Sequence, residues 1–146
     1  MDTLRMEKGY LHWGHDISPE ENQYEAGLNF AISFAKKVDF IGKSFLSKIK
    51  DKKLRKKFVI LSLIKSEPGS PLILHDEPIY CEGKIVGRTT SGNYSFNFQK
   101  NIVFGYINNN KNINNEKLEI EVEKERFKAI LEPRPLHDPE NKIMKH

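Results

Sequence analysis

The sequence is poor in three features, and each shortage excludes a class of protein. Cys81 is the one cysteine in 146 residues, so an intrachain disulfide and a cysteine-based zinc site are both excluded. No stretch approaches the roughly 18 apolar residues that a membrane-spanning helix needs. Residues 1–5 lack the apolar core of a secretory signal and the composition of a transit peptide. We therefore expect a cytoplasmic, reducing compartment and no membrane segment.

The composition is that of an ordinary folded domain. Hydrophobic residues make up 38% and charged residues 30% of the chain. Nine Phe and five Tyr residues argue against disorder. The length suffices for one domain with a real core, or for a small domain together with part of another.

The positive charge is concentrated in one segment. Residues 48–57 (KIKDKKLRKK) hold seven basic residues and one Asp, a local charge of +6. Because the net charge is +4, the remainder of the chain sums to −2. Clustered lysines can bind nucleic acid, yet no aromatic residue is interleaved in this run. We favour a solvated helix end and interdomain linker over a nucleic-acid site.

The first third of the chain predicts one strand and one helix. Residues 28–34 are apolar with partial alternation, as in a strand. Asp39 is a plausible helix cap, and Phe45, Leu46 and Ile49 follow at helical spacing. We expect a helix over 43–49 that continues into the basic run.

From residue 58 onward the pattern becomes short strands separated by turns. Glu82-Gly83 has the composition of a tight hairpin, and Gly92 could supply a bulge or a sharp bend. An Asn-rich loop over 108–115 separates two of the strands. The expected strands are 58–64, 78–81, 84–88, 89–98, 101–107, 117–122 and 126–131. The fold class is therefore mainly β with some α: a partial α+β segment followed by six to seven antiparallel strands that form a barrel or a sandwich.

The residues most suggestive of chemistry lie in the segment 4–17 (LRMEKGYLHWGHDI). The carboxylate of Glu7 could accept two parallel N–H donors, as from a pterin or guanine-like ring. The pattern alone favours a solvated Glu on a strand or helix face. Tyr10 and Trp13 could stack on a heteroaromatic ring, although aromatic residues in such segments are more often part of a core.

The histidines of this segment do not predict a metal site. His12 and His15 could share a helical face, and Asp16 follows them directly. However, Gly14 lies between the two histidines, and no downstream ligand pair completes a site. Nothing in the sequence identifies a nucleophile for either histidine to activate. We predict no metal.

Six motifs in the same order resemble a known family. Glu7-Lys8-Gly9-Tyr10 with Trp13-Gly14 and Asp16-Ile17 comes first, and Glu25-Ala26-Gly27-Leu28 follows. The others are Asp39-Phe40-Ile41-Gly42-Lys43, Gly87-Arg88-Thr89-Thr90-Ser91-Gly92, Gly105-Tyr106 and Pro135-Leu136-His137-Asp138-Pro139. Together they resemble the C-terminal part of the glycine cleavage T-protein (aminomethyltransferase) family. The likeness is closer still to the folate-binding half of dimethylglycine and sarcosine dehydrogenases.

This resemblance implies a fold and a site. It implies a Greek-key barrel over 58–131, within a barrel domain and tail at 58–146. Residues 1–50 would be the end of a folate-binding domain, and 51–57 a basic linker. It makes Glu7 the pteridine anchor.

Two further contacts with folate are expected. Trp13, as an aromatic residue of the same motif, would stack on the ring. The resemblance places Lys36 or Lys37 at the glutamate tail, with an ordinary surface lysine as the alternative. Because the family's catalytic Asp lies upstream of this segment, the resemblance assigns no catalytic residue here. We therefore expect an incomplete tetrahydrofolate site and no turnover by this chain alone.

Two functions stay open at this point. One is a C-terminal part of a tetrahydrofolate-dependent aminomethyltransferase-like protein, which supplies half of a folate site in one-carbon transfer. The other is a non-catalytic accessory module that completes a split T-protein-like partner. The expected partners are folate, and either the polypeptide with the N-terminal part or a second copy of this chain.

Overall fold

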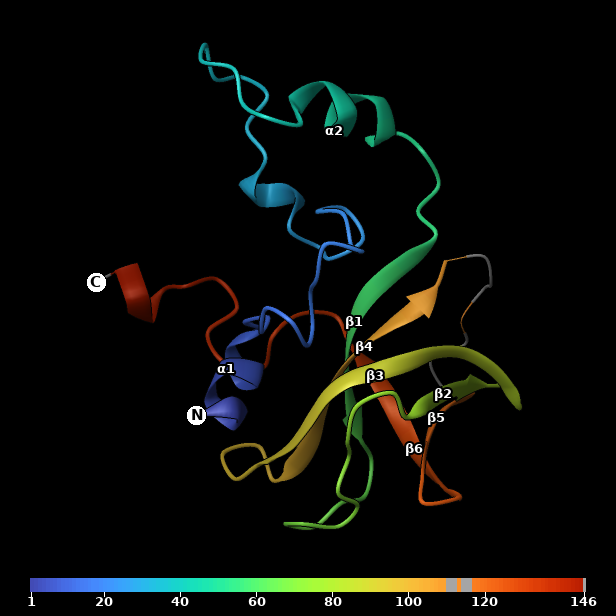
Figure 1. Ribbon diagram of the computed structural model, residues 1–146. Helices are drawn as coiled ribbons and strands as arrows, with labels where there is room; N and C mark the ends of the chain where they lie inside the picture. Colours follow the sequence, from blue (N-terminus) through green and yellow to red (C-terminus); the bar gives the residue numbers. More distant parts are fainter. Residues whose placement is uncertain (110–112, 114–116, 146) are drawn as a thin grey trace.

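The computed structural model describes residues 1–109, 113 and 117–145, and its centre is a closed antiparallel barrel (Figure 1). The six strands are β1 Lys56–Leu63, β2 Pro78–Cys81, β3 Lys84–Ser95, β4 Lys100–Asn108, β5 Leu118–Val122 and β6 Glu125–Glu132. Among the described residues, the short helices are α1 Asp2–Lys8, η1 Asn29–Ala31, α2 Lys43–Ile49 and η3 Ile143–Lys145. The predicted fold class is confirmed, with six strands. Within the described ranges, no helix has the length and apolar character to cross a membrane.

The strand order around the barrel is β1-β4-β3-β2-β5-β6. Strands β2, β3 and β4 follow one another as hairpins, and β5 returns to pair with β2. This order is a Greek key. The barrel closes where β6 pairs with β1, from Ile60 opposite Glu132 to Leu63 opposite Ala129. Among the strands, residues 56–59 of β1 therefore pair with β4 alone, and on their other edge the amide of Phe58 donates to the carbonyl of Glu25 at 2.8 Å.

Alternation along β1 serves two different cores. Val59, Leu61 and Leu63 point into the barrel and are buried there. Ile60 points outward, where it packs with Met6 of α1. Met6 is 1% exposed, and such burial contributes about 2 kcal/mol. Helix α1 is thus held against the outside of the barrel.

The predicted hairpin between β2 and β3 is confirmed. Glu82 and Gly83 both adopt positive φ, 51° and 75°. A two-residue loop of this kind matches the right-handed twist of the strands. The two strands predicted at 84–88 and 89–98 are instead one strand, β3, which ends at Ser95. Its irregularity lies between Thr89 and Ser91 rather than at Gly92.

Gly92 has a packing role that the sequence pattern did not reveal. A Cβ atom at this position would lie 2.5 Å from the side chain of Ile73. Such an approach is closer than real Cβ contacts, so glycine lets the 64–77 connection pass directly over β3. The glycine therefore permits close packing and does not bend the strand.

The first third of the chain corrects two predictions. Residues 28–34 contain the short η1 turn instead of a strand, because no strand edge pairs with them in the described structure. The helix over 43–49 is confirmed as α2, but its N-cap is Gly42 at φ 89°. Asp39 bonds to the backbone amide of Phe40 instead, three residues before the cap. Most of the predicted Asn-rich loop lies outside the described residues.

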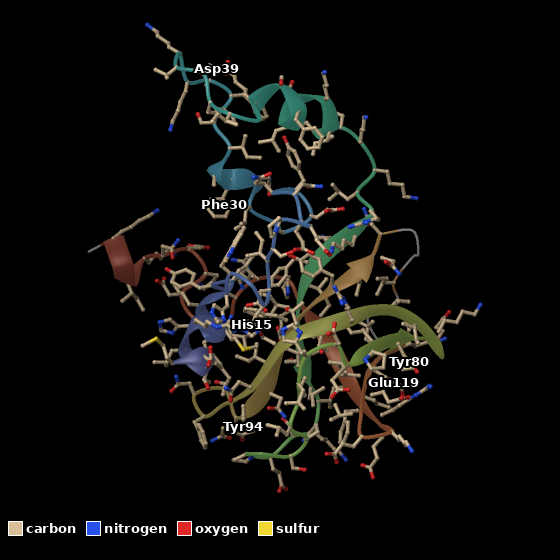
Figure 2. The ribbon with its side chains drawn as sticks, viewed as in Figure 1. His15, Phe30, Asp39, Tyr80, Tyr94 and Glu119 are labelled. Carbon is tan, nitrogen blue, oxygen red and sulfur yellow. The ribbon has the colours of Figure 1, made fainter. Side chains whose placement is uncertain are left out.

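Residues 28–55, which include η1 and α2, form a lobe that projects from one end of the barrel (Figure 1). Leu46 of α2 is buried, and the hydroxyl of Tyr24 donates to its carbonyl at 3.2 Å. Several apolar side chains of the lobe face solvent. Phe30, at 82% exposed, is one example, and it lies on the lobe clear of the barrel (Figure 2).

Candidate functional site

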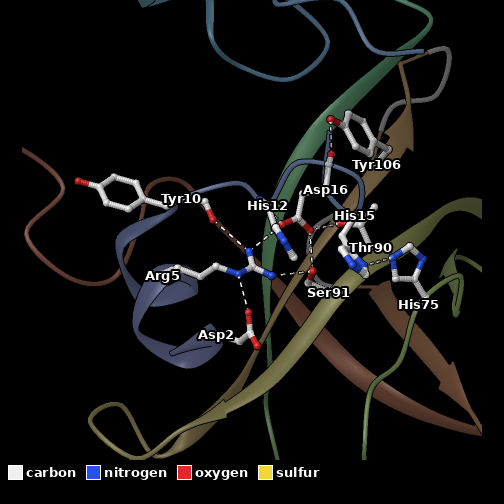
Figure 3. Close-up of polar contacts among 10 residues, drawn as sticks. All are labelled: Asp2, Arg5, Tyr10, His12, His15, Asp16, His75, Thr90, Ser91 and Tyr106. Carbon is white, nitrogen blue, oxygen red and sulfur yellow. Dashed lines mark hydrogen bonds and ion pairs between the residues drawn. The ribbon is translucent and has the colours of Figure 1, made fainter. Parts of the chain in front are cut away.

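The turn after α1 is organised around the buried carboxylate of Asp16 (Figure 3). Its side chain accepts four hydrogen bonds, from the guanidinium of Arg5 at 2.7 Å, the backbone amide of His12 at 2.9 Å, and the hydroxyls of Thr90 at 2.6 Å and Ser91 at 2.7 Å. Asp16 is 1% exposed. A buried charge is tolerated only when it is paired and hydrogen-bonded, and this one meets both conditions.

The same network extends to the barrel wall. The hydroxyl of Tyr106 donates to the carbonyl of Asp16 at 2.9 Å. Burial raises the pKa of Tyr106, and the nearby carboxylates Glu21 and Asp16 raise it further, so the phenol stays a donor. Three motifs that the sequence presents separately, around residues 5–16, 87–92 and 105–106, are therefore one hydrogen-bonded unit. Sequence reasoning missed Asp16 as its centre.

Glu7 lies on the buried face of α1 and does not line the neighbouring cleft. Its carboxylate accepts hydrogen bonds from the hydroxyl of Ser95 at 2.6 Å and the amide of Asn97 at 2.8 Å. At 3% exposed, it contradicts the alternative of a solvated surface residue. A direct contact with a ligand stays a prediction. The present bonds fix the end of α1 against the β3–β4 hairpin.

The C-terminal tail packs against Glu7 and the two residues that follow it. The ammonium of Lys8 pairs with Asp138 at 2.8 Å, and His137 donates its amide to the carbonyl of Glu7 at 2.9 Å. The hydrogen bond from Lys8 holds the pKa of Asp138 below its usual range. Gly9 adopts φ 79°, and a Cβ there would lie 2.4 Å from Pro135. The opening motif and the closing motif of the chain thus form one surface.

A cleft of about 1350 Å³ opens between the N-terminal segment, the tail and the first half of β1. Trp13 and Tyr10 line it with their rings 66% and 51% exposed. Phe30 and Phe45 of the lobe also line it. The cleft is therefore bounded by aromatic rings that a flat ligand can contact.

A buried ion pair between Glu21 and Lys56 lies at the wall of this cleft. Glu21 lines the cleft and bonds to Lys56 and to the hydroxyl and amide of Ser18. Burial acts to raise the pKa of Glu21, but the bonds from Lys56 and Ser18 outweigh it and hold the pKa below its ordinary value. The ammonium of Lys56 also lies 4.8 Å from the ring centre of Tyr106. The turn at 18–21 is thereby tied to β1.

The predicted folate residues are only partly brought together. Trp13 lines the cleft, whereas Glu7 lies buried beside it and Lys36 and Lys37 do not line it. Both lysines are exposed on the lobe. The prediction for the folate tail therefore has no support from their position.

Three histidines meet at the edge of the Asp16 network. The rings of His12 and His15 stack with centroids 4.5 Å apart, and His15 Nδ1 lies 3.1 Å from His75 Nε2 (Figure 3). The side chains are exposed. In the part of the chain that the structure describes, no group of three or more His, Cys, Asp or Glu residues could hold a metal ion.

Sequence models of two protein domains match this chain. The glycine cleavage T-protein C-terminal barrel domain matches residues 56–138, and the GCVT N-terminal domain matches residues 1–36. The first match covers more than half of the chain. The chain belongs to the glycine cleavage T-protein family.

Individual relatives agree with this assignment. Human mitochondrial dimethylglycine dehydrogenase is 35% identical over 136 residues, which are 93% of this chain and 15% of the relative. The formaldehyde-forming 4-methylaminobutanoate oxidase of Paenarthrobacter nicotinovorans is 33% identical, over 99% of this chain and 17% of its own length. An aminomethyltransferase of Listeria welshimeri is 37% identical, over 93% of this chain and 36% of its own. The chain thus spans well under half of each of these relatives.

A solved structure shares the fold. The crystal structure of glycine cleavage system aminomethyltransferase T from Bartonella henselae matches with a TM-score of 0.80 and 21% identity. The match covers 94% of this chain and 38% of that one. The expected family and barrel are therefore confirmed.

Proposed function

We propose that this T-protein family member is the C-terminal part of a tetrahydrofolate-dependent aminomethyltransferase-like protein, and that its cleft supplies part of the folate site in one-carbon transfer. The observation that carries the proposal is the exposed ring of Trp13 on the cleft wall. An indole left 66% exposed contributes little to a core, whereas in a concave site it offers a stacking surface.

The cleft has room for a ligand of this class. Its volume of about 1350 Å³ exceeds the roughly 300–1,000 Å³ that small-molecule sites commonly enclose. Aromatic rings from the N-terminal turn and from the lobe line it. A pteridine ring with an extended tail would fill part of this volume and could contact these rings.

The roles of the residues follow from their positions. Tetrahydrofolate supplies the nucleophilic N5 and N10 atoms that accept the one-carbon unit. Trp13 and Tyr10 orient the ring, so that the protein contributes positioning more than covalent chemistry. Glu7 fixes the end of α1 and thereby places Tyr10 and Trp13 at the cleft.

The domain division belongs to the same proposal. Residues 1–50 complete a folate-binding domain, 51–57 connect it, and 58–146 form the barrel domain with its tail. A cytoplasmic setting is also proposed, and the buried free thiol of Cys81 is compatible with it.

The first test is calorimetric titration of the chain with tetrahydrofolate. We expect saturable binding, weakened about tenfold by Trp13→Ala because a stacking partner is lost. Phe96→Ala is the matched control, since Phe96 is 73% exposed but does not line the cleft. Unaltered affinity in Trp13→Ala would contradict the proposal.

Glu7→Gln separates the two possible roles of this residue. Gln keeps the shape and one acceptor while it removes the charge. Weaker folate binding at unchanged stability would support the direct anchor that the sequence predicts. Loss of stability with little change in affinity for folate would support the positioning role.

A second function is favoured by the exposed apolar side chains ahead of the barrel. Trp13, Phe30 and Phe45 are 66%, 82% and 59% exposed. Trp13 and Phe30 lie within residues 1–36, which match the N-terminal domain model, and Phe45 follows that range. Exposed apolar clusters mark interaction surfaces. The chain would then complete a T-protein-like partner as an accessory module.

Analytical ultracentrifugation tests this second function. The chain is mixed with a polypeptide that carries the GCVT N-terminal domain, and also run alone. A heterocomplex that Phe30→Ser weakens would support the accessory role. A tight homodimer would identify a second copy as the occupant, and a monomer in both runs would reject the accessory role.

A further inference from the structure

The ring of Trp13 is placed by its backbone more than by its own packing. Trp13 is 66% exposed, so few protein atoms surround the indole and hold it in one orientation. A ring on a loose turn would have to be ordered when a ligand stacks on it, and such ordering weakens binding. The value of Trp13 to the cleft therefore depends on how firmly the turn around it is fixed.

Asp16 closes the turn that carries Trp13. One oxygen of its carboxylate accepts a hydrogen bond from the backbone amide of His12 at 2.9 Å. The backbone amide of Asp16 in turn donates to the carbonyl of His12 at 2.8 Å, and the amide of Gly14 donates to the carbonyl of Ile17 at 2.8 Å. Trp13 therefore lies inside one hydrogen-bonded turn, next to the residue that Asp16 holds twice.

The barrel holds the carboxylate of Asp16 through an irregularity in β3. The pairing of β3 with β4 shifts register between Thr89 and Ser91, and Thr90 takes no part in it. A bulge of this kind interrupts the alternation of side chains and re-aims them. The hydroxyls of Thr90 and Ser91 both donate to the same oxygen of Asp16, at 2.6 Å and 2.7 Å (Figure 3). The bulge thus lets two successive side chains meet one acceptor.

Arg5 supports the same carboxylate from the side of α1. Its guanidinium pairs with the other oxygen of Asp16 at 2.7 Å, and it also donates to the hydroxyl of Ser91 and to the carbonyl of Tyr10, both at 3.0 Å. The phenol of Tyr106 on β4 donates to the carbonyl of Asp16 at 2.9 Å. Hydrogen bonds to a charged group are stronger than those between neutral groups. The turn is therefore tied to α1, β3 and β4 at once.

We infer that Asp16 is a positioning residue: it holds the turn of Trp13 in place, and through it strand β3 of the barrel sets the affinity of the cleft. The part of this inference that concerns affinity rests on the proposed function. Asp16 and Thr90 do not line the cleft, so neither touches a ligand bound there. Their contribution is preorganisation, because a ring that is already held loses little freedom when the ligand binds.

Two neighbouring threonines of β3 provide a matched pair of variants. Thr90→Val removes the hydroxyl that donates to Asp16. Thr89→Val removes a hydroxyl that bonds instead to the carbonyl of Leu74 at 2.9 Å and to the amide of Glu77 at 3.0 Å, away from the turn. Both threonines are buried, and Thr89→Val should destabilise the fold at least as much because it leaves two backbone groups without their partner. Thr90→Ser keeps the hydroxyl and should behave as the wild type.

The first measurement needs no ligand. Trp13 is the one tryptophan of the sequence, so the anisotropy of indole fluorescence reports the mobility of this ring alone. We expect the anisotropy to fall in Thr90→Val and to match the wild type in Thr89→Val and Thr90→Ser. An unchanged anisotropy in Thr90→Val would overturn the positioning role. An equal fall in Thr89→Val would also overturn it, since the effect would then follow from lost stability alone.

The second measurement is the Kd for tetrahydrofolate by calorimetric titration of the same variants. We expect Thr90→Val to raise the Kd about threefold, because a looser ring must be ordered on binding, and Thr89→Val to leave it unchanged. An unchanged Kd in Thr90→Val together with a lower anisotropy would overturn the link between β3 and the affinity of the cleft. Failure of the wild-type chain to bind tetrahydrofolate would overturn the proposed function, whereas the difference in anisotropy would still support Asp16 as the residue that positions Trp13.

Discussion

The N-terminal segment 1–17 and the lobe 28–55 precede the same barrel, yet they are held in opposite ways. In the first segment, Met6, Glu7 and Asp16 are all at most 3% exposed and bind the barrel directly. In the lobe, every residue of which the structure describes, Leu46 is the one buried side chain. Each region carries a motif of the T-protein family, so motif content alone does not explain the difference.

The difference lies in where the partners of each motif are found. Asp16 meets Arg5, Thr90 and Ser91, which the same chain provides. Val38 precedes the motif Asp39–Lys43, and Ile41 lies within it. Both apolar side chains face solvent, at 78% and 103% exposed. The first motif is held against the barrel by partners within the chain, whereas the apolar side chains of the second face solvent.

Breaking the centre of the first region should have the largest effect. Asp16→Ala removes the carboxylate that accepts hydrogen bonds from the guanidinium of Arg5 and from the hydroxyls of Thr90 and Ser91. We expect a loss of about 3–5 kcal/mol in the free energy of unfolding, as for a buried pair that loses one partner. Chemical denaturation measures it. Asp39→Ala in the lobe, where the side chain is 84% exposed, should change stability by less than about 0.5 kcal/mol; similar losses in both variants would remove the contrast.

The packing of the tail against α1 can be tested with two glycines. Gly9 and Gly14 both have positive φ, 79° and 88°, but only at Gly9 would a Cβ meet another atom within 4 Å. Gly14→Ala should cost about 1 kcal/mol from backbone strain alone, while Gly9→Ala adds the clash with Pro135 for a total of about 2–3 kcal/mol. Thermal unfolding compares them. Equal losses of stability in the two variants would show that Pro135 moves aside without destabilising the fold.

The ion pair between Glu21 and Lys56 predicts a specific pH dependence. Because the pKa of Glu21 is lowered in the folded state from 4.5, its contribution is fully present above pH 4.5. It is lost as the pH falls through the lowered value. Glu21→Gln should therefore be less stable than wild type by about 1 kcal/mol at pH 7, and the gap should close in acid. A gap that stays constant from pH 7 to pH 3 would argue against this pair.

The smallest effect on stability is expected in the lobe. Ile41→Ser removes an apolar side chain that is 103% exposed, so the free energy of unfolding should change by less than about 0.5 kcal/mol. Binding to a polypeptide with the GCVT N-terminal domain, if this surface docks there, should weaken in the same variant. A destabilisation of more than about 1 kcal/mol would show that the lobe has an internal partner after all.

The sequence predicted local structure well wherever a short pattern decides it. The hairpin at Glu82-Gly83 and the helix at 43–49 depend on turn residues and on helical spacing, which a single segment contains. Residues 28–34 have the composition of a strand but no edge to pair with. Strand formation needs hydrogen bonds from another segment, so composition could not decide it.

The candidate site shows the same limit. Trp13 could be proposed from its motif, and it does line the cleft. The ion pairs of Lys8 with Asp138 and of Lys56 with Glu21 could not be proposed in this way. No spacing in the sequence reports such pairings, because each joins residues that are brought together only by folding.

By itself, the sequence determined the order of the motifs and, through them, the resemblance to a family whose fold includes the barrel, whereas the pattern of short strands left a barrel or a sandwich open. Tertiary structure alone decided that Asp16 is a buried centre, that Glu7 is buried between α1 and the barrel, and that the cleft is bounded by the chain's first and last segments. The physical reason is that burial and charge pairing are properties of contacts between distant segments. Asp16 and Asp39 both belong to family motifs, but the first is buried among residues of the barrel and the second faces solvent. Their different surroundings come from the folded structure.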